Sequence, residues 1–88
     1  MSYYYIYVLL SNKTGKWYTG YTHNLRKRFD EHNAGFCKST KHGCPWKLIY
    51  YEACLFKEDA IAREKYLKSG MGKRYLKNRL KYYLTKRV

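Results

Sequence analysis

Tyrosine is the residue that most constrains how this chain can build a core. Twelve of the 88 residues are Tyr, whereas Ala, Val, Ile and Leu together number only 18. A chain this short forms one domain, so we expect residues 1–88 to share a single core. Each buried tyrosine hydroxyl needs a hydrogen-bond partner. Either many of these rings are half exposed, or some of the hydroxyls have a chemical role.

Basic residues far outnumber acidic ones. The chain has 19 Lys and Arg against six Asp and Glu, a net charge of +13, and residues 65–88 carry nine basic residues and no acid. A folded domain this basic typically binds a polyanion by neutralising phosphates and releasing counterions. The apolar and aromatic content argues against disorder. Nucleic acid is favoured over an anionic membrane surface, because basic and aromatic residues run through the whole chain and no lipidation motif is present.

The cysteines indicate a reducing compartment. There are three, an odd number, and no signal peptide precedes them, so we expect a cytoplasmic protein without a disulfide framework. Cys37, His42 and Cys44 match no standard zinc-ligand spacing and are interpreted as ordinary loop residues.

Hydrophobic patterning predicts an α+β fold with the order β-β-α-β-α-α. The predicted strands cover residues 3–10, 17–21 and 46–53, and the predicted helices cover residues 25–34, 58–69 and 73–85. Gly15 is expected at positive φ in the first turn, Thr22 or Asn24 should cap the first helix, and Gly35 should end it. We therefore predict a small three-stranded antiparallel sheet flanked by three helices.

The first predicted helix carries polar residues on its apolar face. Leu25, Arg28, Phe29 and His32 follow helical spacing, and Leu25 and Phe29 identify the face turned toward the sheet. Arg28 and His32 would then lie at the edge of the buried stripe. They could serve a site, or Arg28 could extend to solvent while His32 merely packs.

The second predicted helix also carries a charged residue on its apolar face, and here the residue is acidic. Ala60, Ile61, Glu64 and Leu67 share a face, so a carboxylate lies inside an apolar stripe. A desolvated carboxylate needs a cation, which could be a metal ion or Lys68 one turn later.

Two tyrosines are expected to converge in the first hairpin. Alternation places Tyr18 and Gly20 on one side of the second strand, and Gly20 leaves bare backbone beside a hydroxyl. Tyr7 lies in the facing strand, so the two hydroxyls could meet on one ligand. Ordinary cross-strand aromatic packing is the alternative.

Four short motifs in order resemble the GIY-YIG nuclease superfamily, and most closely its single-domain bacterial members, which are similar to the nuclease half of the bacterial excision-repair nuclease. The motifs are Tyr5-Ile6-Tyr7, Tyr18-Thr19-Gly20, Asn24-Leu25-x-x-Arg28-x-x-x-His32-Asn33 and Ala62-Arg63-Glu64-Lys65-x-Leu67-Lys68-Ser69-Gly70. Together they cover nearly the whole chain.

The resemblance implies a metal-dependent endonuclease that hydrolyses phosphodiester bonds of DNA, in repair or in the processing of branched or single-stranded DNA. Glu64 would be the sole protein ligand to one Mg²⁺ or Mn²⁺. Tyr18 would be the general base or orient the attacking water, and Tyr7 would assist. Arg28 would stabilise negative charge on the phosphate, and His32 would donate to a phosphate or relay a proton. Cleavage would leave a 5′-phosphate and a 3′-hydroxyl.

Two departures from the family pattern bear on recognition. Tyr5 stands where the name-giving glycine would be, and Tyr21 follows Gly20 where the repair type has a lysine. Larger members carry separate DNA-binding domains, and none is expected here. Recognition should then depend on the loop of residues 36–45 and on the last helix, with DNA favoured over RNA. The expected nucleic-acid-binding residues are Lys38, Lys41, Lys68, Lys73, Arg74 and Lys77.

Two other functions remain open from the sequence. The chain could be a non-catalytic nucleic-acid-binding module with the same fold. It could also be a basic interaction protein at a membrane surface or on the ribosome. A pure binder has no need of all five proposed catalytic residues together, which favours the nuclease.

Overall fold

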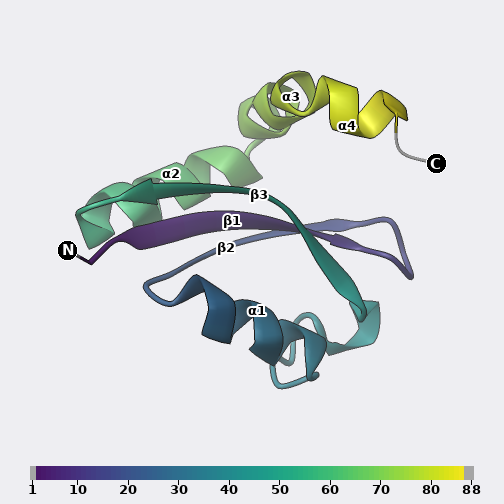
Figure 1. The fold of residues 1–88 in the computed structure, drawn as a ribbon. Helices are drawn as coiled ribbons and strands as arrows, with labels where there is room; N and C mark the ends of the chain where they lie inside the picture. Colours follow the sequence, from purple (N-terminus) through teal and green to yellow (C-terminus); the bar gives the residue numbers. More distant parts are fainter. Residues whose placement is uncertain (1, 87–88) are drawn as a thin grey trace.

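The computed structural model describes residues 2–86, which form a three-stranded antiparallel sheet with helices on both faces. The strand order is β2-β1-β3, and Figure 1 shows α1 on one side of the sheet and α2 on the other. The elements are β1 (Tyr4–Ser11), β2 (Trp17–Thr22), α1 (Leu25–Asn33), the short 3₁₀ helix η1 (Lys41–Gly43), β3 (Trp46–Cys54), α2 (Lys57–Lys68), α3 (Gly70–Arg79) and α4 (Lys81–Lys86). The predicted α+β class and antiparallel sheet are confirmed.

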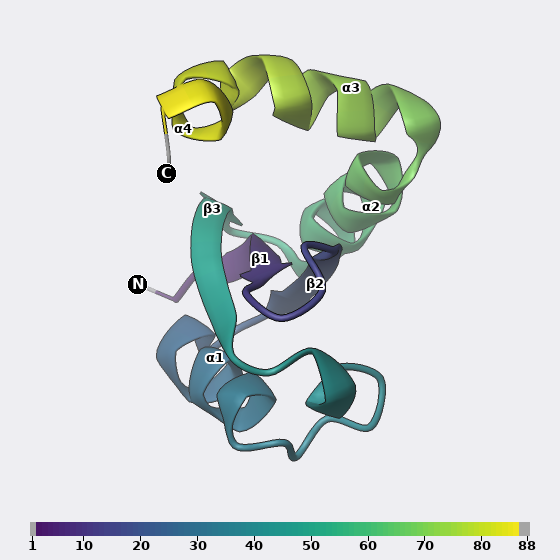
Figure 2. The same cartoon turned by 90° about the vertical axis from the view of Figure 1, so that its right-hand side faces the viewer.

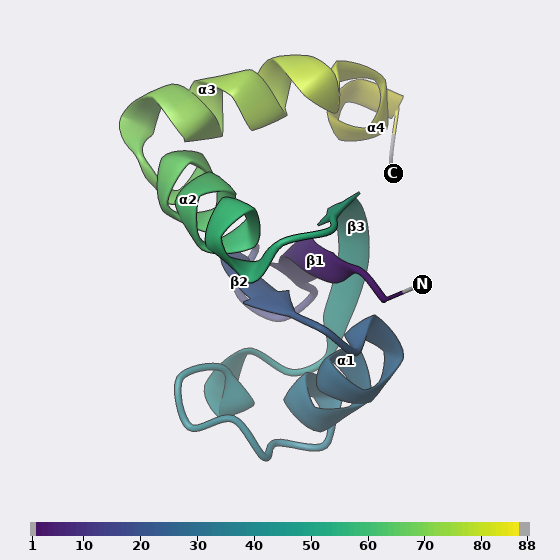
Figure 3. The ribbon, with the colours of Figure 1, turned by 90° about the vertical axis from the view of Figure 1, so that its left-hand side faces the viewer.

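The central strand β1 supplies both halves of the core. Ile6 and Val8 point to the face covered by α2 and α3, where they meet Leu67. Tyr7 and Leu9 point to the opposite face, because successive side chains of a strand alternate. Figures 2 and 3 show the layers from two sides, with α1 beyond one face and α2 to α4 beyond the other. Tyr7 is thereby directed into the α1 layer.

The predicted turn and cap residues take up the expected roles. Gly15 has φ 76° and Gly35, just after α1, has φ 79°. Asn24 is the cap of α1, and its side chain accepts a hydrogen bond from the backbone N–H of Lys27. These local signals fix where the helix begins, and therefore where Arg28 and His32 lie.

The predicted C-terminal helix of residues 73–85 is wrong in two respects. It is divided at Leu80 into α3 and α4, and α3 begins at Gly70, so the structure contains four α-helices in its described residues. Ser69 caps α3 by accepting from the N–H of Gly72. A Cβ at Gly72 would collide with the backbone of Tyr66 and Leu67. Gly72, which falls between the predicted helices 58–69 and 73–85, is therefore a close-packing residue inside α3.

The predicted apolar face of α2 is also narrower than expected. Ala60 and Leu67 are buried, but Ile61 is 38% exposed. No helix within residues 2–86 has the length and apolar character needed to cross a bilayer.

A polar cluster on the same layer joins α2 to the sheet. Arg63 donates to Glu52 of β3 through Nε at 2.8 Å and through Nη2 at 2.9 Å. The hydroxyl of Tyr50 donates to the same carboxylate at 2.7 Å, and the Arg63 guanidinium lies 4.8 Å from the ring centroid of Tyr75. We call this pairing the Glu52–Arg63 clasp. Bidentate ion pairs of this kind are geometrically specific, so the clasp fixes α2 against β3.

Candidate active site

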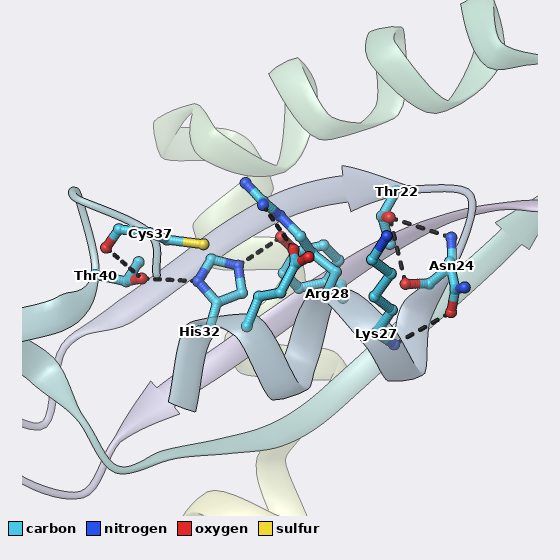
Figure 4. A network of polar contacts seen from close by, with 9 residues as sticks. Thr22, Asn24, Lys27, Arg28, His32, Cys37 and Thr40 are labelled. Carbon is cyan, nitrogen blue, oxygen red and sulfur yellow. Dashed lines mark hydrogen bonds and ion pairs between the residues drawn. The ribbon is translucent and has the colours of Figure 1, made fainter. Parts of the chain in front are cut away.

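His32 is the centre of a buried hydrogen-bond chain. Its side chain has no exposure to solvent. Its Nε2 lies 2.8 Å from the Tyr7 hydroxyl, and its Nδ1 lies 2.7 Å from Oγ1 of Thr40. Figure 4 shows His32 on α1 with Thr40 on the neighbouring loop. Helix α1, strand β1 and the loop after α1 thus meet at one imidazole.

Donor and acceptor counting assigns the tautomer of His32. Tyr7 is 1% exposed, so its buried proton needs an acceptor, and Nε2 provides one. The ring proton is then on Nδ1 and is donated to Thr40. The Thr40 hydroxyl in turn donates to the carbonyl of Cys37 at 3.4 Å. The chain therefore runs in one direction, from Tyr7 through His32 to the loop.

Burial sets the protonation states of both groups. Burial, and next the nearby Arg28 charge, lower the pKa of His32 to about 4, while Glu31 opposes this shift. Burial also raises the pKa of Tyr7 to about 12, while Arg28 acts in the opposite direction. At neutral pH, His32 is therefore an uncharged proton acceptor and Tyr7 is a protonated phenol.

The depressed pKa of His32 predicts a loss of stability in mild acid. The unfolded chain takes up a proton on His32 near pH 6.5, whereas the folded chain does so only near pH 4. Above about pH 6.5 the titration of His32 does not reduce the free energy of unfolding. As the pH drops toward 4, the free energy of unfolding falls by at most about 3 kcal/mol. Chemical denaturation at several pH values should show this slope. His32→Gln should remove much of it, and the exposed control His23→Gln should keep it.

Arg28 joins this cluster from the same face of α1. It forms an ion pair with Glu31 at 3.1 Å, and its side chain is 41% exposed. Its guanidinium is close enough to Tyr7 to lower the pKa of that hydroxyl. It also lines a cavity of about 680 Å³ together with Tyr21, Lys27 and Lys57. Arg28 therefore has a buried contact on one side and an open, basic space on the other.

Tyr18 and Gly20 complete the cluster from β2. Gly20 pairs with Tyr7 across the sheet, and Tyr18 pairs with Leu9. The Tyr18 ring centroid lies 6.4 Å from that of Tyr7 and 5.0 Å from that of His32. A Cβ at Gly20 would lie 2.6 Å from the Tyr7 hydroxyl oxygen, which shows that Tyr7 rests directly on bare backbone. The two tyrosine rings therefore lie close together on one face of the sheet, whereas the meeting of their hydroxyls on one ligand stays a prediction.

Glu64 lies in the other layer, on α2. Its carboxylate pairs with Lys68 at 3.2 Å, and its side chain is 19% exposed. Within residues 2–86, no hydrogen bond or ion pair joins Glu64 to the Tyr7, Tyr18, Arg28 and His32 cluster. The structure thus brings four of the five predicted catalytic residues into direct association and pairs the fifth with Lys68.

Two separate cavities are each lined by a residue of α2 and by a residue of the cluster. The cavity beside Arg28 is also lined by Lys57, the first residue of α2. A smaller cavity of about 190 Å³ is lined by Tyr18 and by Lys68, the last residue of α2. Both ends of α2 therefore border spaces that the cluster also borders, and Glu64 is one helical turn from Lys68.

A divalent ion would find a limited donor set here. In the described part of the chain, no three His, Cys, Asp or Glu side chains are grouped to hold a metal. Mg²⁺, however, is commonly held by one or two carboxylates, with waters and substrate phosphates as the other ligands. The Glu64 carboxylate is half-buried and has one oxygen, Oε2, engaged by Lys68. The residues present fit a single-carboxylate site that substrate completes.

The expected nucleic-acid-binding residues fall into two regions. Lys68, Lys73 and Lys77 line cavities beside β2. Lys38 and Lys41 are exposed in the loop after α1, and Arg74 is exposed on α3. The first group lies beside β2, whereas Lys38 and Lys41 lie in the α1 layer and Arg74 lies on α3 in the opposite layer.

Three residues of the site were missed in the sequence. Glu31 could have been found, because it follows Arg28 by three residues on a helix. Thr40 and Cys37 gave no such signal, since only the folded loop brings them to His32. That loop is held by Trp46, whose indole N–H donates to the Thr40 carbonyl at 2.8 Å.

Comparison with known proteins agrees with this arrangement. Residues 3–77 match the family model for the GIY-YIG catalytic domain. A UPF0213 protein of Clostridium perfringens is 44% identical over 65 residues, covering 73% of this chain and 69% of that protein. A UPF0213 protein of Bacillus licheniformis is 40% identical over 84 residues, covering 94% and 81%. The solution structure of a UPF0213 protein from Bacillus halodurans has a TM-score of 0.52 at 35% identity, covering 84% of this chain and 81% of that one. With tyrosines, arginine and histidine of the motifs gathered in one cluster, this chain belongs to the GIY-YIG catalytic domain family.

Proposed function

We propose that the protein is a metal-dependent endonuclease that hydrolyses phosphodiester bonds of DNA. The observation that carries the proposal is the buried chain from Tyr7 through His32 to Thr40, beside a half-exposed Arg28. A module that only binds phosphates needs cations at its surface, and has no need of a desolvated, neutral histidine bonded to a tyrosine. A hydrolase needs this kind of proton acceptor beside a site for an anion.

In this proposal Tyr7 and His32 handle the proton of the attacking water. Tyr7 takes that proton as it passes its own to Nε2 of His32, so a free phenolate with a pKa of about 12 is never required. Glu31, which raises the pKa of His32, helps to stabilise the imidazolium. The family resemblance implies Tyr18 as the general base. However, it is the hydroxyl of Tyr7 that is hydrogen-bonded to a proton acceptor, Nε2 of His32. We therefore assign the proton transfer to Tyr7 and give Tyr18 the role of lining the site.

Arg28 and Glu64 would act on the phosphate of the substrate. The Arg28 guanidinium, oriented by Glu31, would stabilise the negative charge that develops on the phosphoryl oxygens. Glu64 would hold the divalent ion, which when bound neutralises phosphate charge and polarises a phosphoryl oxygen. Lys68, now paired with Glu64, would be released toward the phosphate backbone.

The test is cleavage by the wild type against Glu64→Gln. The substrates are labelled single-stranded, duplex and branched DNA oligonucleotides, with RNA versions of each, in Mg²⁺, Mn²⁺ or EDTA. We expect Glu64→Gln to lose at least about 10²-fold in rate, with little effect on folding because an i,i+4 pair contributes only about 0.3–0.5 kcal/mol. Glu58→Gln, an exposed residue of the same helix, is the matched control and should cleave like the wild type.

Two results would contradict the proposal. Equal cleavage by wild type and Glu64→Gln would remove Glu64 from the reaction. Binding without cleavage of any substrate would identify the protein as a non-catalytic nucleic-acid-binding module.

A further inference from the structure

A basic groove runs from Tyr18 toward the turn between β1 and β2. It consists of two cavities that share Trp17 and Lys73. One, of about 190 Å³, is lined by Tyr18, Lys68 and Lys73, and the other, of about 400 Å³, is lined by Lys16, Lys73 and Lys77. We call the two together the β2–α3 groove. It meets the cluster of Tyr7, Tyr18, Arg28 and His32 at Tyr18 and extends from there to the turn between β1 and β2.

The charge of this groove has one sign over most of its length. Lys16 comes from the hairpin turn, and Lys73 and Lys77 are one helical turn apart on α3, all three exposed. The acid closest along α2, Glu64, is engaged with Lys68. Residues 65–86 contain no acid at all. Cations that converge from two separate elements form a surface suited to a row of phosphates.

The groove also has an apolar wall at its middle. Trp17 lines both cavities and packs partly against the core of the α2 layer, so its position is fixed. An indole edge between lysines offers contact to a sugar or base, while the lysines meet the phosphates on either side. An acidic peptide or a free small anion would pair with the lysines without contacting the indole of Trp17.

We propose that the β2–α3 groove binds the nucleic-acid strand on one side of the scissile phosphate. Lys16, Lys73 and Lys77 contact its phosphates, and Trp17 contacts its sugars or bases. This inference rests on the proposed function, because it takes the Tyr7–His32–Arg28 cluster as the point of cleavage. The cavity beside Arg28, with Lys27 and Lys57, then receives the strand on the other side. The substrate would then follow β2, the edge strand of the sheet, from one end to the other.

The test measures binding and does not depend on cleavage. In a Glu64→Gln background, the affinity for a labelled DNA oligonucleotide is measured by anisotropy at several salt concentrations. Lys73→Ala with Lys77→Ala should weaken binding and reduce the slope of log affinity against log salt by about 1.4–1.8, for two lost phosphate contacts. The matched control is Lys81→Ala with Lys86→Ala, the same charge change on α4 outside the groove, which should leave the slope nearly unchanged.

Tryptophan fluorescence supplies an independent readout. The chain has two tryptophans, and Trp46 is only 7% exposed. DNA should therefore quench the emission of Trp17, and Trp17→Phe should abolish the quenching while binding persists. Polyglutamate of matched charge should not quench it. Equal slopes for both lysine pairs, or quenching that survives in Trp17→Phe, would overturn the assignment of the groove. If the wild type does not cleave DNA but the lysine and Trp17 variants change binding and quenching as expected, the nuclease proposal is wrong and the groove assignment stands.

Discussion

Tyr7→Phe is expected to lower the single-turnover rate of DNA cleavage by about 10²–10⁴-fold, the usual contribution of a positioned acid or base. The substitution removes the hydroxyl that lies 2.8 Å from Nε2 of His32 and keeps the ring that packs against β2. The proton of the attacking water then has no route to the imidazole. The fold should survive, at a cost of about 1–3 kcal/mol for the unpaired ring nitrogen.

Tyr18→Phe is the matched control for this substitution. Tyr18 lies on the same face, with its ring centroid 5.0 Å from that of His32, but its hydroxyl has no hydrogen bond to the imidazole among the described residues. We expect a smaller loss of rate than for Tyr7→Phe. If Tyr18→Phe is the more damaging change and Tyr7→Phe cleaves normally, the base is Tyr18 and the assignment to Tyr7 is wrong.

Gly20→Ala is expected to reduce cleavage about as severely as Tyr7→Phe, although it changes no catalytic group. The added Cβ would lie 2.6 Å from the Tyr7 hydroxyl oxygen and 2.8 Å from Cζ of the same ring. Tyr7 is buried and cannot move aside freely, so its hydroxyl must leave Nε2 of His32. Overpacking of this kind also costs about 1–3 kcal/mol in stability. Cleavage rates and thermal denaturation should be measured together, with rates taken well below the transition.

Gly70→Ala provides the comparison within the same chain. A Cβ at Gly70, in the first turn of α3, would meet no atom within 4 Å. This variant should cleave normally and be as stable as the wild type, or slightly more so, because alanine restricts the unfolded chain. Full activity in Gly20→Ala would show that the contact between Tyr7 and bare backbone has no role in catalysis.

Much of the site could be predicted because its parts are encoded locally. Helical spacing predicts Arg28 and His32 on the face of α1 that carries Leu25 and Phe29, and strand alternation predicts Tyr18 and Gly20 on one side of β2. Each inference needed only the period of one element and one short turn. The positions of these side chains follow directly once the elements form.

The rest depends on contacts between segments that no local pattern reports. Thr40 lies eight positions after His32 in the sequence. It reaches the imidazole because the hydrogen bond from Trp46 holds the loop folded back on α1. Gly72 falls outside the predicted helices because the sequence does not show that the backbone of α2 passes beside it. Helical spacing groups Ile61 with Ala60 and Leu67, but the sequence does not show which part of that face the sheet covers, and Ile61 is 38% exposed.

The Glu52–Arg63 clasp has a mechanical consequence for any ligand at the β2 edge. It ties α2 to β3 across the short connection between them through a bidentate pair. The clasp therefore opposes movement of α2 away from the sheet. Under the proposed function, a nucleic-acid strand that is already bent, gapped or frayed would then fit beside α2 with less distortion than a straight duplex.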